Sequence, residues 1–220
     1  MTPYYPVCLD LHDRPCVVIG GGSVAARKVE GLLECGARVT VVAPVLAPAL
    51  ETLLQQGRIA ARRRAYAHGD LEGAALAIAA TDEREVNARV AAEARARGVW
   101  LNAADDPERC DFILPAVIRR GDLQIAISTG GRSPALARRV REDLERLLPA
   151  EYAELLPLLA EVRAELRAEG VDVPPERWQS AVDDYVLARL RAGDRAGARA
   201  RLRAGLVLQP LVIPKTHTEA

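Results

Sequence analysis

The sequence predicts an α/β protein, in which a parallel-sheet domain is followed by a small α+β unit and a C-terminal helical segment. Three observations predict this order. Short apolar runs alternate with amphipathic segments up to about residue 113, and a three-glycine turn joins one early run to a helix. Beyond residue 149 the pattern is helical throughout. Alternating strands and helices with short links favour a right-handed parallel sheet.

The first half of the chain alternates between strand and helix patterns. A β-branched run ends at Pro44, and Gly36, Gly57 and Gly98 each stop a segment with helical periodicity. A continuous run of small apolar residues over 74–80 is typical of a central parallel strand, which is covered on both faces. We expect strands over 7–11, 15–19, 38–43, 59–62, 74–80 and 99–103, and helices over 24–35, 47–56 and 83–97. Residues 1–113 therefore form a predicted Rossmann-like NAD-binding domain.

The pattern changes after residue 113. Two strand-like runs, 112–118 and 123–128, flank a turn at residues 119–122 and predict a hairpin. Ser133 is placed to cap a helix that begins at Pro134 and runs to about residue 148. A lone hairpin is only marginally stable in water, so we expect this 114–149 unit to form a homodimer through the same hairpin of a second subunit.

The last third is predicted to be a helical domain over 150–204, with helices over 151–169, 175–190 and 195–203. The arginine-rich end of this domain, from Arg189 to Arg203, is interpreted as a solvated helix face. Residues 205–220 contain two prolines and no periodicity, and we expect a flexible tail there.

Composition excludes several classes of protein. Lysine plus arginine and aspartate plus glutamate both number 30, so the net charge offers no argument for nucleic-acid binding. The four cysteines are scattered and no histidine is spaced with another ligand, so neither a disulfide framework nor a metal site is expected. No apolar run could span a bilayer and no basic N-terminal region indicates a signal peptide. We expect a cytoplasmic protein without membrane contact.

The glycine turn is the first candidate site. Gly20, Gly22 and Ala25 have the G-x-G-x-x-(G/A) spacing of a dinucleotide-binding turn. The glycines allow a sharp turn and a close approach of backbone N–H groups to a diphosphate, while the helix start supplies positive charge. The candidate cofactor ligands here are Gly20, Gly21, Gly22, Ser23 and Val24. The alternative is a tight turn that binds nothing.

The acidic residue that commonly holds the adenosine ribose is absent. It is expected at the end of the second sheet strand, where this chain has Val42, Ala43 and Pro44. Ala43 and Pro44 would then contact the ribose through backbone atoms. This rule therefore leaves NAD and NADP undecided.

Ligands in open α/β sheets bind at the carboxyl ends of the strands. Thr81 and Asp82 follow one predicted strand, and Asn102 and Asp105 lie at the end of the next. Thr81 and Asn102 are candidates for the cofactor cleft. Asp82 either lines the cleft or caps the following helix, and Asp105 is either a general acid/base or a turn residue.

A second glycine pair lies in the smaller unit. Thr129, Gly130, Gly131, Arg132 and Ser133 precede a helix and could bind an anion. Several arginines lie near them in sequence: Arg119, Arg120, Arg132, Arg138 and Arg139. These would suit a polycarboxylate substrate, or they form a solvated basic face.

These motifs occur together, in order, in a known family. The chain has Gly20-Gly21-Gly22-x-Val24-Ala25-x-Arg27-Lys28, Ala80-Thr81-Asp82, Asn102-x-x-Asp105, Phe112-Ile113-x-Pro115-Ala116 and Ser128-Thr129-Gly130-Gly131-x-Ser133-Pro134. Over roughly residues 3–160 it resembles the precorrin-2 dehydrogenase / sirohydrochlorin ferrochelatase family. The two glycine strings make the resemblance specific.

The resemblance implies NAD-dependent oxidation of precorrin-2, a tetrapyrrole with eight carboxylates, to sirohydrochlorin on the way to sirohaem or cobalamin. It implies a homodimer and assigns the acid/base role to Asp105. Some members also insert Fe²⁺ or Co²⁺, so chelatase activity stays open. Arg27 and Lys28 would contact either the cofactor phosphates or the carboxylates of the substrate. The helical segment is only loosely family-like, and the tail beyond residue 205 matches no known pattern.

Two other functions remain as alternatives, an NAD-sensing regulatory module and a chelatase without dehydrogenase activity. The intact glycine turn argues against the second. Fused members of the family carry a methyltransferase domain, for which 220 residues leave no room. We therefore expect precorrin-2 to come from a separate protein.

Overall fold

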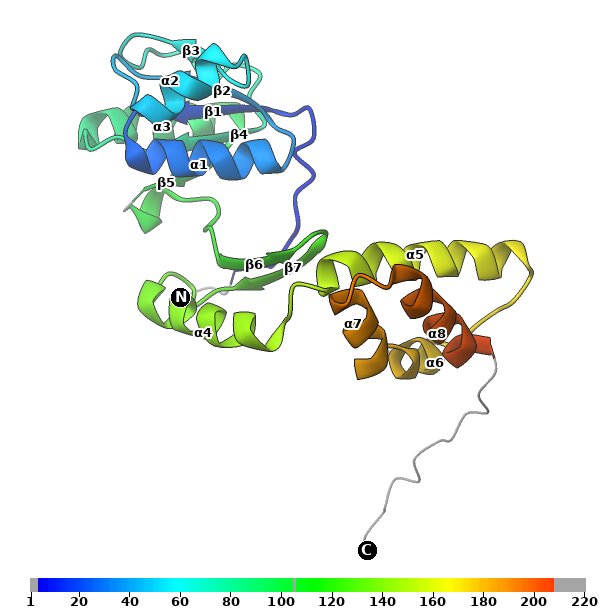
Figure 1. The fold of residues 1–220 in the computed structure, drawn as a ribbon. Coiled ribbons are helices and arrows are strands. Elements are labelled where there is room, and N and C mark those ends of the chain that lie inside the picture. The colour runs from blue at the N-terminus through cyan, green and yellow to red at the C-terminus, as the bar shows by residue number, and fades with distance from the viewer. Residues whose placement is uncertain (1–3, 105, 208–220) are drawn as a thin grey trace, which may run out of the picture. The chain divides into compact units, whose positions relative to one another are not determined.

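The computed structural model describes residues 4–104 and 106–207 of the chain (Figure 1). These residues form two compact units. The first comprises Met1–Leu114 with Ser128–Ser133, and the second comprises Pro115–Ile127 with Pro134–Ala220. The first break lies within one residue of the expected boundary at 113. The expected 114–149 and 150–204 segments fall largely within one unit.

The first unit contains the predicted parallel sheet, with strand order β3-β2-β1-β4-β5 (Figure 1). All four strand pairs are parallel. This order places β1 at the centre and brings the carboxyl ends of β1, β2 and β4 together. In sequence the strands are β1 (Pro15–Ile19), β2 (Arg38–Val42), β3 (Ala60–Arg62), β4 (Leu76–Ala79) and β5 (Trp100–Ala103).

Helices cover both faces of this sheet, as expected for a parallel sheet with buried strands. The helices are α1 (Ser23–Glu34), α2 (Pro48–Gln55) and α3 (Arg84–Arg97). Val18 of β1 packs with the buried residues of α1 and α2, whereas its neighbours Val17 and Ile19 pack with those of α3. This alternation along β1 places the strand between two layers of helices. A short 3-10 helix, η1 (Pro107–Arg109), follows β5.

The strand expected over 7–11 is not formed. Val7 and Leu9 are exposed, and the segment enters a turn in which the Arg14 N–H donates to the Leu11 carbonyl. The Asp10 carboxylate accepts from the His12 N–H, which further commits this segment to a turn. A strand needs a paired neighbour for its backbone groups, and β2 and β4 already flank β1.

The predicted hairpin is confirmed in the second unit, where β6 (Ala116–Arg120) and β7 (Leu123–Ile127) pair antiparallel around Gly121 and Asp122. Its first strand begins four residues later than expected, after Pro115, which has no N–H to donate. Helix α4 (Pro134–Leu147) packs against the hairpin and begins at the predicted proline.

The remaining helices bury a core of their own. No helix within the described ranges has both the length and the apolar character to cross a membrane. The helices are α5 (Tyr152–Ala168), α6 (Pro175–Ala181), α7 (Asp184–Arg191) and α8 (Arg195–Val207). The single helix expected over 175–190 is wrong. Asp183 interrupts it and caps α7, because its carboxylate accepts the Val186 N–H at 2.9 Å. Helix α8 runs past 204, and residues 208–220 of the expected tail lie outside the described residues.

Candidate cofactor cleft

A cleft of about 870 Å³ opens in the first unit at the carboxyl ends of β1, β2 and β4. Nine of the ten predicted cofactor residues line it. They are Gly20, Gly21, Gly22, Ser23, Val24, Ala43, Pro44, Thr81 and Asp82. Residues around the same rim that sequence reasoning did not single out include Val45, Tyr66, Arg84 and Asn87.

The three glycines of the turn differ in how much space a side chain would have. Gly20 has φ +129°, and a Cβ there would lie 2.2 Å from the Ala80 carbonyl oxygen. A Cβ on Gly21 would lie 1.9 Å from the Val45 carbonyl oxygen. A Cβ on Gly22 would meet no heavy atom of the described residues within 4 Å. The first two glycines therefore permit close backbone packing, and the third leaves open space at the start of α1.

Main-chain hydrogen bonds hold this turn in place. The Gly20 N–H donates to the Val42 carbonyl at 3.0 Å, and the Ala47 N–H donates to the Gly21 carbonyl at 2.7 Å. Ala25 lies on the buried side of α1 and is fully buried, as expected of the small residue in the turn motif. The turn is thus fixed between β1 and the segment that follows β2.

The N-terminus of α1 is suited to an anion. Gly22 is its N-cap, and the described residues provide neither a side-chain cap nor an acid in the first turn. The first N–H groups of the helix and its positive dipole end therefore face open space. A diphosphate is the group that such a helix start holds in dinucleotide-binding folds. The turn fits the predicted NAD.

The wall at the end of β2 is apolar. Ala43 is buried, and Val45 is 77% exposed at the rim. The Ala43 N–H donates to the Arg62 carbonyl, which brings residues 62–66 beside the end of β2. The flat, apolar surface of Pro44 and Val45 suits an adenosine better than a charged group.

Three consecutive arginines follow this wall and are all held by carboxylates. Arg62 and Arg64 bind Asp70 at 2.6 Å, and Arg63 binds Glu51 at 2.5 and 2.8 Å. Burial alone would raise the pKa of Asp70, but hydrogen bonds from Arg64, the Ala67 N–H and Arg62 hold that pKa well below its usual range. The carboxylate is ionised whenever the protein is folded near neutral pH.

A buried carboxylate fixes Tyr66, another residue of this wall. Glu93 of α3 accepts the Tyr66 hydroxyl and the N–H groups of Gly69 and Leu71, and it pairs with Arg97 at 2.8 Å. Burial and the bond to Glu93 raise the pKa of Tyr66, which stays neutral. Tyr66, Gly69 and Leu71 lie more than 20 residues from Glu93 in sequence, so no local pattern could have indicated these three contacts.

The residues after β4 line the cleft from the other side. Thr81 accepts the Glu83 N–H with its hydroxyl, and Asn87 donates to the Thr81 carbonyl. Helix α3 begins at Arg84 with no side-chain cap, so Asp82 does not take the capping role that was its alternative. Arg84 is exposed at this rim, and its guanidinium bonds to no described residue.

Asn102 differs from the other predicted cofactor residues. It is buried, donates to the Phe112 carbonyl at 2.9 Å, and is not among the residues that line the cleft. This bond ties β5 to the segment that follows η1. Asp105 lies outside the described residues, while its neighbours Ala104 and Asp106 line the cleft.

The predicted substrate residues lie elsewhere. Arg27 and Lys28 are on α1 and do not line the cleft. Arg27 is exposed. Burial raises the pKa of the Cys110 thiol, and the positive charge of Lys28 partly opposes that rise. In the second glycine pair, Gly130 and Gly131 both have positive φ. The loop forms hydrogen bonds within itself. The Thr129 hydroxyl accepts the Ser133 N–H, and the Thr129 carbonyl accepts the Arg132 N–H.

The nearby arginines are largely engaged. Arg138 and Arg139 pair with acids one turn later on α4, and Arg120 donates to the carbonyls of Glu145 and Leu148. These contacts agree with the solvated-face alternative for Arg138 and Arg139. Arg119 and Arg132 have contacts of their own.

Comparison with known proteins gives two family matches. Residues 7–116 match a family described as putative NAD(P)-binding, and residues 120–147 match the central part of a sirohaem biosynthesis protein. The siroheme synthase of Methylobacillus flagellatus is 40% identical over 196 residues, which are 88% of this chain and 42% of that protein. That of Methylococcus capsulatus is 44% identical over 183 residues, 82% of this chain and 38% of that protein.

The chain thus spans about two fifths of the length of these curated relatives. A solved structure, SirC, described as a precorrin-2 dehydrogenase, is similar over nearly its whole length. It has a TM-score of 0.71 and 28% identity, covering 90% of this chain and 98% of that one.

Proposed function

This chain belongs to the NAD(P)-binding family that matches residues 7–116, and we propose that it is an NAD-dependent dehydrogenase that oxidises precorrin-2 to sirohydrochlorin. The product would serve sirohaem synthesis, with cobalamin synthesis as the other use. One observation carries the proposal: an open diphosphate cradle at Gly22, in a cleft large enough for a dinucleotide. The similarity to SirC over 98% of that chain supports the choice of substrate.

The reaction removes two hydrogens from the macrocycle, one as hydride and one as a proton. Bound NAD supplies the hydride acceptor. The protein must hold the dinucleotide, for which it offers the α1 start and the apolar wall at Pro44, and it must accept the proton. We assign that proton to Asp105, in line with the family resemblance and with the position of Ala104 and Asp106 on the cleft rim.

The substrate's eight carboxylates call for cationic and N–H donors. We assign these to Arg27 and Lys28 on α1 and to the loop of Thr129, Gly130, Gly131, Arg132 and Ser133. The N–H groups of Gly130, Arg132 and Ser133 already have internal partners, so the Arg132 side chain would contribute a large share of the loop's binding.

We also propose that the protein acts as a homodimer in the cytoplasm. β6 and β7 form a two-stranded sheet, so each has an outer edge without a partner strand among the described residues. Such a sheet is marginal alone and gains from further pairing.

Anaerobic incubation with precorrin-2, with and without NAD, tests the activity through the absorbance of the macrocycle and of NADH. We expect NAD-dependent formation of sirohydrochlorin and NADH in equal amounts. Asp105→Asn should abolish turnover and keep NAD affinity, whereas the matched variant Asp106→Asn should retain most turnover. NAD binding without any oxidation would favour the sensor alternative and overturn the proposal.

A second arm decides the chelatase question. Sirohydrochlorin is incubated with Co²⁺ or Fe²⁺ in the absence of NAD. Protein-dependent metal insertion would establish chelatase activity in addition to oxidation. Insertion without any oxidation of precorrin-2 would replace the dehydrogenase proposal with the chelatase alternative.

A further inference from the structure

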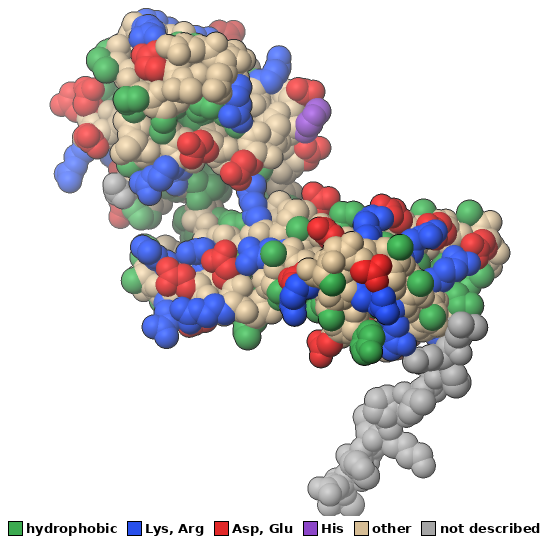
Figure 2. Space-filling view, in the orientation of Figure 1, with side chains coloured by type: hydrophobic (Ala, Val, Ile, Leu, Met, Phe, Trp, Pro, Cys, Tyr) green, Lys and Arg blue, Asp and Glu red, His purple; other side chains and the backbone are tan. Residues whose placement is uncertain are grey.

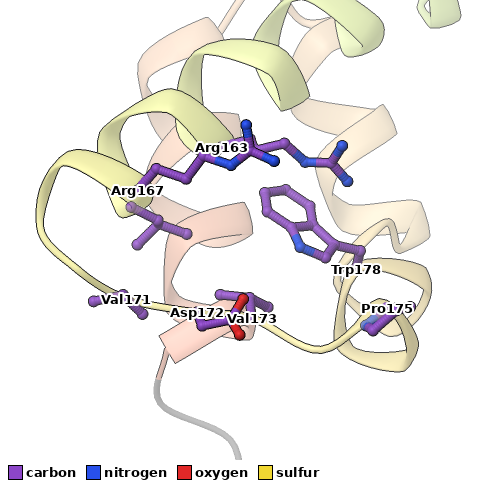
Figure 3. Close-up of a pocket in the computed structure, with 8 residues that line it drawn as sticks. Arg163, Arg167, Val171, Asp172, Val173, Pro175 and Trp178 are labelled. Atoms are coloured by element: carbon purple, nitrogen blue, oxygen red, sulfur yellow. The ribbon is translucent and has the colours of Figure 1, made fainter.

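A second pocket, of about 300 Å³, lies wholly within the helices of the second unit (Figure 3). Helix α5 contributes Arg163, Leu166 and Arg167, and the loop to α6 contributes Val171 to Val173. Trp178 of α6 forms a further wall. The volume is at the lower end of the range for small-molecule sites and suits a compound with one ring.

The arginines of this pocket differ from the others on these helices. The surface of α5–α8 carries interspersed basic and acidic side chains (Figure 2), and most of its arginines bind a carboxylate. The pairs are Arg189–Asp194, Arg191–Glu151, Arg195–Glu161, Arg199–Glu165, Arg201–Asp183 and Arg203–Glu169. The guanidinium of Arg167 has no hydrogen-bond or ion-pair partner within the described ranges, and that of Arg163 has one cation–π contact there, with the ring of Trp178 at 4.8 Å.

Neither guanidinium group has a carboxylate partner among the described residues. Arg163 and Arg167 are four residues apart on α5, so they project from the same face of the helix. Figure 3 shows both side chains extending from α5 on the side of Trp178, with Asp172 on the loop across the gap. The cation–π contact holds Arg163 in position and lowers the entropy lost on binding. One acid faces two arginines, so the pocket keeps a net positive charge.

The rest of the lining is apolar and includes a flat ring. Leu166 is buried, and Val171, Val173, Pro175 and the indole of Trp178 complete the lining. Guanidinium groups bind carboxylates through paired, charge-assisted hydrogen bonds, and an indole offers a stacking surface to a planar ring. The two kinds of surface are adjacent in one pocket.

We propose that this pocket binds a one-ring aromatic carboxylate, whose carboxylate is held by Arg163 and Arg167 and whose ring packs against Trp178. The site is separate from the cofactor cleft in sequence and in lining residues. It therefore does not depend on the dehydrogenase activity.

Tryptophan fluorescence gives a direct test, because the chain has two tryptophans and Trp178 lines the pocket. In a Trp100→Phe background with saturating NAD, the protein is titrated with benzoate, nicotinate and pyrrole-2-carboxylate, and with neutral benzamide. We expect a saturable change for at least one carboxylate and binding of benzamide at least about tenfold weaker, since a charged hydrogen bond is lost.

Variants distinguish carboxylate binding in this pocket from an effect of the protein's overall charge. Arg167→Gln and Arg163→Gln should each weaken carboxylate binding about tenfold or more. The matched variant Arg199→Gln removes a paired arginine of α8 and should leave binding unchanged, with urea denaturation confirming that each variant folds. The proposal is overturned if no carboxylate gives a saturable change, if benzamide binds as well, or if Arg199→Gln has the same effect as Arg167→Gln.

Discussion

Glu51 holds Arg63 through two parallel hydrogen bonds of 2.5 and 2.8 Å, and the carbonyl of the preceding Arg62 accepts the Ala43 N–H at the end of β2, where an adenosine ribose binds in such folds. Asp70 accepts two hydrogen bonds from Arg64 and one from Arg62, the two flanking arginines. A ribose 2′-phosphate would therefore meet arginines that are already neutralised. Any preference for NAD over NADP would then reflect the carboxylates that occupy these cations, and not an acid on the ribose.

Releasing Arg63 should admit NADP. We expect Glu51→Gln to strengthen NADP binding about tenfold and to leave NAD binding unchanged, because a freed guanidinium can pair with the 2′-phosphate. Isothermal titration with both cofactors measures this. Glu72→Gln removes one exposed acid elsewhere in the unit, and an equal gain in that control would show an effect of net charge alone.

The glycines of the turn should respond differently to alanine. Gly21→Ala forces a Cβ against the Val45 carbonyl and should lower the free energy of unfolding by more than about 2 kcal/mol. Gly22→Ala places its methyl in open space and should cost less than about 1 kcal/mol, while weakening NAD binding at least tenfold. Urea denaturation and NAD titration compare the two. Equal stability losses would contradict the packing described here.

Asp70 should make the first unit sensitive to acid. Its pKa is lowered from the 3.8 of a free carboxyl, so the stabilisation it provides is present above pH ~4 and is lost as the pH falls further. The difference in free energy of unfolding between wild type and Asp70→Asn should therefore be largest near pH 7 and shrink below pH ~4. Urea denaturation across that range checks this, and a constant difference would contradict it.

The helix break at Asp183 should show in a graded series. Asp183→Ala removes the cap of α7 and the pair with Arg201, and should destabilise the second unit by about 1–2 kcal/mol. Asp183→Asn keeps a capping oxygen and should recover most of that loss. Helix content and urea denaturation distinguish the variants, and an Asn variant as unstable as the Ala variant would show that the ion pair dominates.

Local patterns predict much of the first unit. The run of β-branched residues before Pro44, the glycine stops and the turn motif place every strand of the parallel sheet and its three helices within a few residues. These features carry their signal in consecutive residues, since the central strands β1 and β4 are buried along almost their whole length and a glycine lies at or just after the end of each helix.

What the sequence did not indicate depends on distant partners. Val7 and Leu9 alternate like a strand, but a strand forms only where a neighbour can pair with it. Asn102 lies in a motif with Asp105, yet its amide reaches the Phe112 carbonyl. The contacts of Glu93 with Tyr66 likewise join α3 to the cleft wall across 27 residues. Acids of α5 pair with arginines of α8, and not with Arg163 or Arg167 of their own helix, so the pattern of ion pairs depends on the packing of α5 against α8.

The turn at Gly20 and Gly21 is anchored by main-chain bonds to Val42 and Ala47, and the helix start that follows offers main-chain N–H groups. Recognition of a diphosphate there would use main-chain N–H groups, which every amino acid except proline possesses. Substitutions around the turn therefore alter the cleft chiefly through their volume, and the surrounding side chains are free to diverge in evolution as long as they stay small. Tolerance to mutation in this segment should follow residue size and not polarity.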